Sequence, residues 1–128
     1  MSLFNKIFGS AEEENKESKI RWILLTDLGH LKEITEESNN LPVVIFKHST
    51  RCSVSRMALR HFENEFDLDG KITPYFLDLL NHRDVSNEIA TKFEVVHQSP
   101  QLLLISSGKC IYNTSHSDID AATIKEYL

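Results

Sequence analysis

Cysteine, net positive charge and long apolar runs are all scarce in this 128-residue chain. The two cysteines, Cys52 and Cys110, are too few for a disulfide scaffold and too far apart for a CxxC motif or a clustered zinc site. Lys and Arg number 14 against 19 Asp and Glu, which gives a formal net charge of −5. That charge argues against non-specific binding to nucleic acid, which requires a basic surface.

No apolar run approaches the ~18 residues that a membrane-spanning helix needs, so we expect no membrane partner. Residues 1–9 are briefly apolar, but they lack the core of a signal peptide and lead directly into acidic sequence. We therefore expect a protein of the reducing cytoplasm. The length predicts one domain, and 41% apolar with 26% charged residues is typical of a globular protein.

The chain divides into a flexible, acidic N-terminal segment at 1–19 and a folded domain at 20–128. Residues 10–19 hold four Glu and two Lys, with no large apolar side chain. The apolar residues in 3–8 leave open a single amphipathic turn that docks on another surface.

Strands and helices are predicted to alternate along the folded domain. Apolar runs predict strands at 22–25, 41–46, 72–79 and 101–105, and a Ser107-Gly108 turn leads to a partner strand at 109–113. Helical spacing of apolar residues predicts helices at 27–38, 53–66, around 85–93 and at 124–128. This order predicts an α/β fold with a mixed central sheet and helices on both of its faces.

Two helices carry more detailed predictions. The helix at 27–38 is expected to take its N-cap from Thr26 or Asp27. The helix at 53–66 is expected to bury one stripe and to leave Ser55, Arg56, Arg60 and Glu63 off it. The expected buried stripe consists of Val54, Met57, Ala58, His61, Phe62 and Phe66.

The strongest functional signal is the stretch 46–55, which reads FKHSTRCSVS. A buried strand is expected to end at Phe46, and Cys52 then lies where the next helix begins. The free N–H groups and positive dipole of a helix start stabilise an anion, and Arg51 and Arg56 add positive charge nearby. A lowered pKa is therefore expected for Cys52, which suits a nucleophile in disulfide exchange. The alternative, a small buried hydrophobe, fits its polar neighbours less well.

Two further features accompany Cys52. Ser55 occupies the place of the resolving cysteine in a dithiol oxidoreductase, so the motif is CxxS; its hydroxyl can donate to a thiolate but cannot form a disulfide. Ser99-Pro100 directly precedes a predicted strand, which is typical of a cis-proline loop, although an ordinary trans proline gives the same pattern. The candidate residues for substrate binding and tuning are Thr50, Arg51, Ser53, Ser55, Ser99 and Pro100.

The element order, the helix-initial Cys52 and the position of Pro100 together resemble the thioredoxin fold over residues 20–128. The stretches 48–55, 99–105 and Ser115-His116 resemble, more narrowly, the YtxJ-like monothiol bacilliredoxins, also called bacillithiol system redox-active proteins. The resemblance implies that Cys52 takes bacillithiol from S-thiolated client proteins and holds it until a second thiol releases it. It also implies that Pro100 is a cis proline facing Cys52. Many relatives have proline after this cysteine, where this chain has Ser53.

Other candidates are secondary. Cys110 is expected to be a buried or half-buried free thiol in the last strand, with a resolving or intermolecular role as the alternative. His48 is a secondary candidate for the site. His97 and His116 flank the proline loop and the end of the hairpin, where either could face the site, and each is expected to be a surface or packing residue. No metal and no tightly bound cofactor are expected; bacillithiol would act as a thiol co-substrate.

Two rival functions stay open on the sequence alone. A monothiol glutaredoxin using glutathione would be supported by CGFS, whereas this chain has CSVS. A non-catalytic thioredoxin-fold binding module would suit the acidic charge, because a fold alone does not prove an activity. The pKa of Cys52 would separate catalysis from simple binding.

Overall fold

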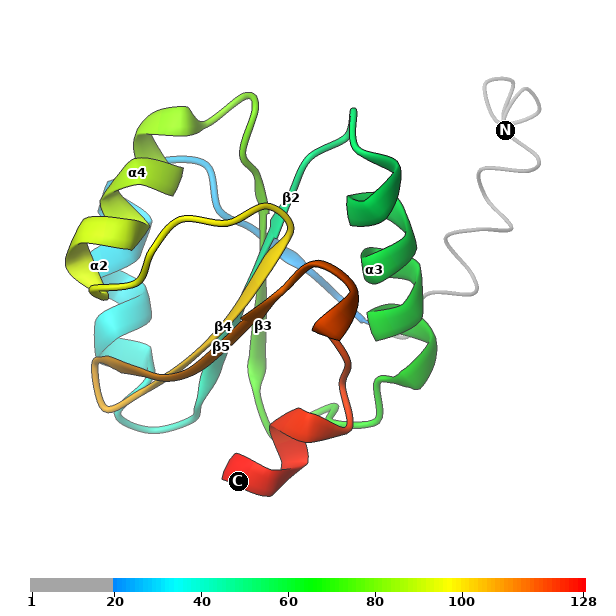
Figure 1. Ribbon diagram of the computed structural model, residues 1–128. Coiled ribbons are helices and arrows are strands. Elements are labelled where there is room, and N and C mark those ends of the chain that lie inside the picture. Colours follow the sequence, from blue (N-terminus) through cyan, green and yellow to red (C-terminus); the bar gives the residue numbers. More distant parts are fainter. Residues whose placement is uncertain (1–19) are drawn as a thin grey trace, which may run out of the picture.

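A computed structural model describes residues 20–128 of the chain, so the predicted flexible segment at 1–19 lies outside the described residues. Five strands form one sheet in the order β1-β3-β2-β4-β5 (Figure 1). The strands β1 (Ile23–Leu24), β3 (Thr73–Asp78) and β2 (Val43–His48) run parallel, whereas β4 (Gln101–Ser106) and β5 (Lys109–Ser115) join antiparallel. The mixed sheet confirms the predicted α/β class.

Helices cover both faces of this sheet. One face carries α3 (Ser53–Glu65), and the other carries α2 (Gly29–Glu37) and α4 (Arg83–Lys92), as Figure 1 shows. Two short 3-10 helices, η1 (His116–Asp118) and η2 (Thr123–Tyr127), follow β5 on the α3 side, where the sequence predicts one final helix. Each face buries its own apolar cluster, so the sheet separates two cores.

Strand β2 is buried along its whole length and alternates between the two cores. Val44 and Phe46 pack towards α3, while Val43 and Ile45 pack towards α2 and α4, as the two-residue period of a strand requires. The strand was predicted to end at Phe46, but it continues through His48. Lys47 and His48 pair with Leu77 and Asp78 of β3, which extends the ladder by two polar residues.

The predicted buried stripe of α3 is only partly right. Ala58, Phe62 and Phe66 are buried as expected, but Val54, Met57 and His61 are exposed and Ser55 is fully buried. Both sets have helical spacing, so the pattern alone does not choose between them. The polar partners that Ser55 finds beneath the helix decide which stripe faces inward.

The predicted cap of α2 is also wrong. The helix begins at Gly29 after Leu28, and neither Thr26 nor Asp27 caps it with a side chain. The His30 ring holds both residues instead, accepting a hydrogen bond from Thr26 N–H at 3.3 Å and lying 3.7 Å from the Asp27 carboxylate.

The predicted hairpin turn is confirmed. Ser107 and Gly108 have φ of 52° and 78°, the two consecutive positive values of a two-residue turn, and they join β4 to β5. Within residues 20–128 no helix is long and apolar enough to cross a membrane.

Candidate active site

Cys52 is the residue immediately before α3, as the sequence predicts. Its backbone is extended, with φ −109° and ψ 121°, and its carbonyl accepts the hydrogen bond from Arg56 N–H at 3.1 Å. Its own N–H donates to Ser49 O at 3.2 Å, which closes the loop between β2 and the helix. The thiol is free and partly exposed. It therefore lies at the N-terminal end of α3, beside the N–H groups of the first helical turn.

Ser55 anchors this loop from below. Its fully buried hydroxyl oxygen accepts a hydrogen bond from Ser49 N–H at 3.0 Å and lies 2.7 Å from Nδ1 of His48. Because the hydroxyl has one proton, it donates to His48 when Nδ1 is unprotonated. The sequence predicted that this hydroxyl can donate to the thiolate. In the structure it is instead directed to His48 and Ser49, so it fixes the position of Cys52 through the backbone.

His48 is nearly buried and its pKa is lowered. Burial is the main cause of the lowered pKa. The negative charge of Asp78 raises the pKa in part, and the positive charge of Arg56 lowers it further. The ring also lies against Phe76 with centroids 5.4 Å apart. Its strand partner Asp78 accepts from the Asn81 amide at 2.8 Å through Oδ2, while Oδ1 is buried with no hydrogen-bond partner among the described residues. At neutral pH the neutral ring of His48 therefore accepts a hydrogen bond from the Ser55 hydroxyl.

Lys47 holds a second loop, the one before the cis proline, on the opposite face of the sheet. Its ammonium is buried, with 0% of the residue exposed, and lies 2.8 Å from Nδ1 of His97. Burial lowers the pKa of Lys47 to about 8. The pKa of His97 is lowered too, by burial first and then by Lys47 and Arg83. The neutral His97 ring therefore accepts a hydrogen bond from the Lys47 ammonium. His97, expected to be a surface or packing residue, thus ties the loop after α4 to β2.

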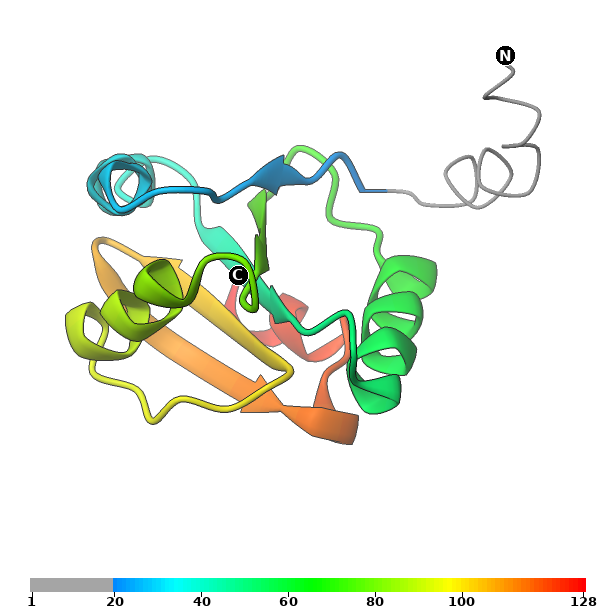
Figure 2. The same cartoon turned by 90° about the horizontal axis from the view of Figure 1, so that it is seen from above.

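The same loop is held a second time, by Gln101. This fully buried side chain donates to Val96 O at 3.0 Å and accepts from Gln98 N–H at 3.4 Å. The loop ends at Ser99-Pro100, where the peptide bond is cis, as the resemblance implied. In the register Lys47 pairs with Gln101, so Pro100 adjoins the end of β2 from which the Cys52 loop departs. Figures 1 and 2 both show the segment before β4 beside the start of α3.

His116 reaches the proline loop through its backbone. Its N–H donates to Pro100 O at 3.1 Å, and its φ of 58° turns the chain from β5 into η1. The side chain is exposed. Three segments therefore meet at one end of the sheet: the Cys52 loop, the cis-proline loop and η1. Ser99 between them makes no hydrogen bond from its backbone to the described residues, which leaves its N–H and C=O free.

The remaining predicted residues surround this end of the sheet. Arg56 donates from Nη1 to Thr50 O at 3.1 Å, which holds a positive charge over the Cys52 loop. Arg51 and Ser53 are exposed on either side of the cysteine.

Cys110 lies at the opposite end of the sheet. It pairs with Ile105, which in turn pairs with Val43 at the start of β2, whereas Cys52 follows the end of β2. A six-residue strand spans roughly 17–20 Å, far beyond the ~7 Å limit between Cα atoms for a disulfide. Its thiol donates to Tyr112 O at 3.3 Å, and burial raises its pKa. Cys110 is the half-buried free thiol that the sequence predicts, and it is out of reach of Cys52.

Three residues of this arrangement escaped the sequence analysis as site components: Lys47, Asp78 and Gln101. Two polar residues continuing an apolar strand into the Cys52 loop were the available signal, since burying them requires partners.

Comparisons with solved structures agree with this geometry. One structure, described as an oxidoreductase with a thioredoxin fold, is 32% identical, with a TM-score of 0.71 over 81% of this chain and 90% of that one. Thioredoxin from Malassezia sympodialis is 16% identical, with a TM-score of 0.66 over 86% and 90%. Mitochondrial thioredoxin 3 from Saccharomyces cerevisiae is 17% identical, with a TM-score of 0.61 over 83% and 92%. The last two show the fold alone.

A partly exposed cysteine at a helix start, near the cis-proline loop of a thioredoxin fold, is the arrangement of a thiol–disulfide oxidoreductase site. The family model for the monothiol bacilliredoxin BrxC matches residues 23–124. The chain belongs to the monothiol bacilliredoxin family and is a thiol–disulfide oxidoreductase.

Proposed function

We propose that Cys52 removes bacillithiol, or a similar low-molecular-weight thiol, from mixed disulfides on client proteins. One observation carries the proposal. Cys52 is partly exposed at the start of α3, and the only other cysteine in the sequence lies at the far end of the sheet. With no second thiol in reach, the chemistry stops at a mixed disulfide on Cys52 until another thiol arrives.

The proposed reaction has two exchanges. The Cys52 thiolate attacks the low-molecular-weight sulfur of the client disulfide, and the client sulfur leaves as a thiolate that takes up a proton. Cys52 now carries the small thiol as a mixed disulfide. A second small thiol, as thiolate, attacks that small thiol's sulfur, regenerates the Cys52 thiolate and leaves as a symmetric disulfide. The client is reduced and the pair of small thiols is oxidised, so electrons balance.

The cis-proline loop supports the alignment of the incoming disulfide. Ser99 presents a free backbone N–H and C=O at the end of the sheet from which the Cys52 loop departs, and an extended substrate segment can pair with both. Lys47, through His97, and Gln101 hold this loop in place. We propose S-thiolated proteins as the partners and a low-molecular-weight thiol as the co-substrate.

Transfer from a defined client tests the proposal. The client carries bacillithiol on one cysteine and is mixed with the full-length chain, and intact masses are followed with time. We expect the client to lose one bacillithiol while the chain gains one, and Cys52→Ser to abolish both changes. A parallel client carrying glutathione tests the glutaredoxin-like alternative. Faster transfer from this client would identify glutathione, rather than bacillithiol, as the preferred co-substrate. No transfer from either client would contradict the proposal and favour a binding module.

A further inference from the structure

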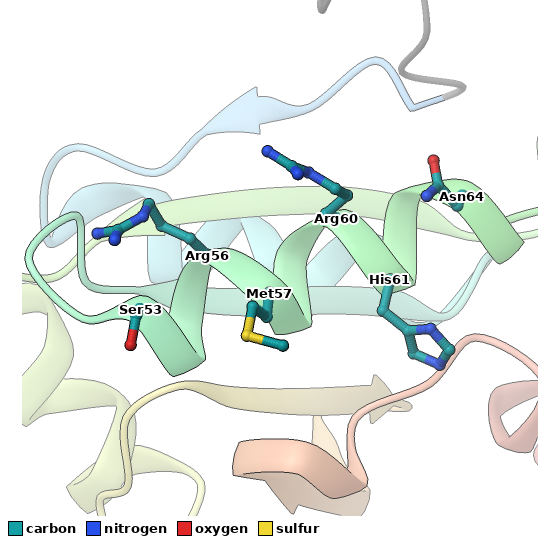
Figure 3. A pocket seen from close by; sticks show the side chains of 6 residues that line it. All are labelled: Ser53, Arg56, Met57, Arg60, His61 and Asn64. Atoms are coloured by element: carbon teal, nitrogen blue, oxygen red, sulfur yellow. The ribbon is translucent and has the colours of Figure 1, made fainter.

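The exposed face of α3 next to Cys52 forms an open groove of about 430 Å³. Figure 3 shows its lining along the helix, with Arg56 and Arg60 extending on one side and Met57 and His61 on the other. Met57 is 72% exposed and Arg60 is also exposed, although α3 contributes its other face to a packed core. The groove begins at Ser53, directly after the nucleophile. Its lining residues are Ser53, Arg56, Met57, Arg60, His61 and Asn64.

Positive charge collects along this face in an otherwise acidic chain. Arg51, Arg56 and Arg60 form no ion pair with any residue in 20–128, where the pairs present are His30–Asp27, His61–Glu65 and Lys125–Asp67. The nearby carboxylates have other partners, since Glu63 accepts from the Trp22 indole at 2.7 Å and Glu65 lies 3.4 Å from His61. The arginines are therefore available to an external anion.

The size and position of the groove limit its occupant. Its volume of about 430 Å³ is in the range of small-molecule sites. At 1.5 Å per residue, Arg56 and Arg60 lie about 6 Å and about 12 Å along the helix axis from Cys52. These axial distances are within the length of a small thiol joined to Cys52, so its anionic groups and the two arginines lie on the same part of the helix.

We infer that the face of α3 formed by Arg56, Met57 and Arg60 selects low-molecular-weight thiols that carry carboxylates. This inference rests on the proposed exchange at Cys52 and adds the residues that recognise the charge of the small thiol. In the step concerned, the Cys52 thiolate attacks a symmetric small disulfide, a Cys52 mixed disulfide forms, and one small thiolate leaves. The arginines act on the charge of the incoming disulfide and do not take part in the bond changes.

Three small disulfides of different charge test the inference. The probes are oxidised glutathione, which is anionic, bis(2-hydroxyethyl) disulfide, which is neutral, and cystamine, which is cationic. The rate of Cys52 adduct formation is followed by intact mass for each probe, and rates are expressed relative to the neutral probe. Changes in the intrinsic reactivity of Cys52 affect all three probes alike and cancel in this ratio.

Two double variants with equal charge loss are compared. Arg56→Gln with Arg60→Gln changes the α3 face, and Lys32→Gln with Lys92→Gln removes two charges from the helices on the opposite face of the sheet. Because exposed charge pairs contribute modestly, we expect the arginine variant to lower the anionic-to-neutral ratio about fivefold. The cationic ratio should rise, and the lysine control should change neither. Arg60→Gln alone, which keeps the Arg56–Thr50 bond, should give part of the effect.

The outcomes separate this inference from the proposed function. Equal ratios in the two double variants would overturn the inference while leaving exchange at Cys52 intact. A wild-type chain that forms no Cys52 adduct with any probe would overturn both. Loss of the anionic preference at high salt, where exposed charges are screened, would support it further.

Discussion

The two cysteines lie at opposite ends of the same sheet and show what makes a thiol functional in this fold. Cys52 follows the polar end of β2, where a helix begins and hydrogen bonds of the buried Lys47 and His48 hold two loops in place. Cys110 lies at the other end of the sheet in a core-facing position. Burial raises the pKa of its thiol, and the thiol donates a hydrogen bond to the backbone carbonyl of Tyr112. Both thiols are partly buried, so exposure alone does not separate them. The surrounding backbone and polar groups do.

The polar end of β2 has a simple design. Consecutive residues of a strand point to opposite faces, so Lys47 and His48 reach different layers of the molecule. Lys47 holds the loop before the cis proline through His97, and His48 holds the Cys52 loop through Ser55. One strand end therefore positions both the nucleophile and the segment that aligns its substrate.

The largest effect should come from exchanging the two cysteines for serine in turn. Cys52→Ser should reduce disulfide exchange to the uncatalysed rate, because a serine hydroxyl does not replace a thiolate in this chemistry. Cys110→Ser should keep the wild-type rate, since it lies out of reach of the site. The rate of mixed-disulfide reduction measures both. A comparable loss of rate in Cys110→Ser would contradict the claim that Cys110, at the far end of the sheet, takes no part in exchange at Cys52.

Lys47 should make the stability of the chain depend on pH. The unfolded lysine keeps its proton up to about pH 10.5, whereas the folded one releases it near pH 8, so the free energy of unfolding should rise across this window. Between pH 8 and pH 10 we expect the contribution to be about 2 kcal/mol. Urea unfolding of the wild type and Lys47→Met gives this contribution as a difference. The pKa values of Tyr75 and Cys110 are also changed by burial, but both residues are present in the two chains, so their contributions cancel. Parallel curves for the two chains would show that Lys47 is not desolvated.

Two buried serines offer a matched pair across the sheet. Ser55 binds Ser49 N–H and His48 at the polar end, and Ser38 accepts from Gly108 N–H and donates to Thr35 O at the other. Replacing either with alanine should cost about 1–2 kcal/mol, because buried partners lose a hydrogen bond. Only Ser55→Ala should also slow exchange at Cys52. If Ser38→Ala slowed exchange equally, the effect would be one of general stability.

The smallest effect concerns the reactivity of Cys110. Its raised pKa and partial burial should make alkylation of Cys110 at pH 8 about fivefold slower in the folded chain than in urea. The Cys52→Ser variant isolates this thiol, and labelling by iodoacetamide followed by mass measurement gives both rates. Equal rates in folded and unfolded chains would mean that the last strand does not protect it.

The sequence predicted the scaffold well because apolar patterning determines it. The runs around 43–46 and 101–105 are continuous apolar segments, and the order of elements along the chain and the Ser107-Gly108 turn followed from such local signals. Cys52 was placed correctly because a helix start is also a local feature. The cis bond at Pro100 matched what the family resemblance implied.

The supporting hydrogen bonds were missed because they join residues far apart in the chain. Lys47 has no local reason to be buried, and only the tertiary fold brings its ammonium within 2.8 Å of the exposed His97. The same holds for Ser55, whose burial decided which stripe of α3 faces inward and left Met57 exposed. Periodicity indicates that a helix is amphipathic, but two adjacent stripes of similar spacing need the partner surface to choose between them.

The most direct test of the central claim locates the adduct in the wild-type chain. The protein is treated with a limiting amount of oxidised bacillithiol, free thiols are blocked with iodoacetamide, and peptides are mapped by mass spectrometry without reduction. Because the two cysteines lie at opposite ends of the sheet, we expect one bacillithiol on Cys52. Cys110 should carry no bacillithiol and should be alkylated by iodoacetamide. Bacillithiol on Cys110, or a disulfide between Cys52 and Cys110 within one chain, would contradict it.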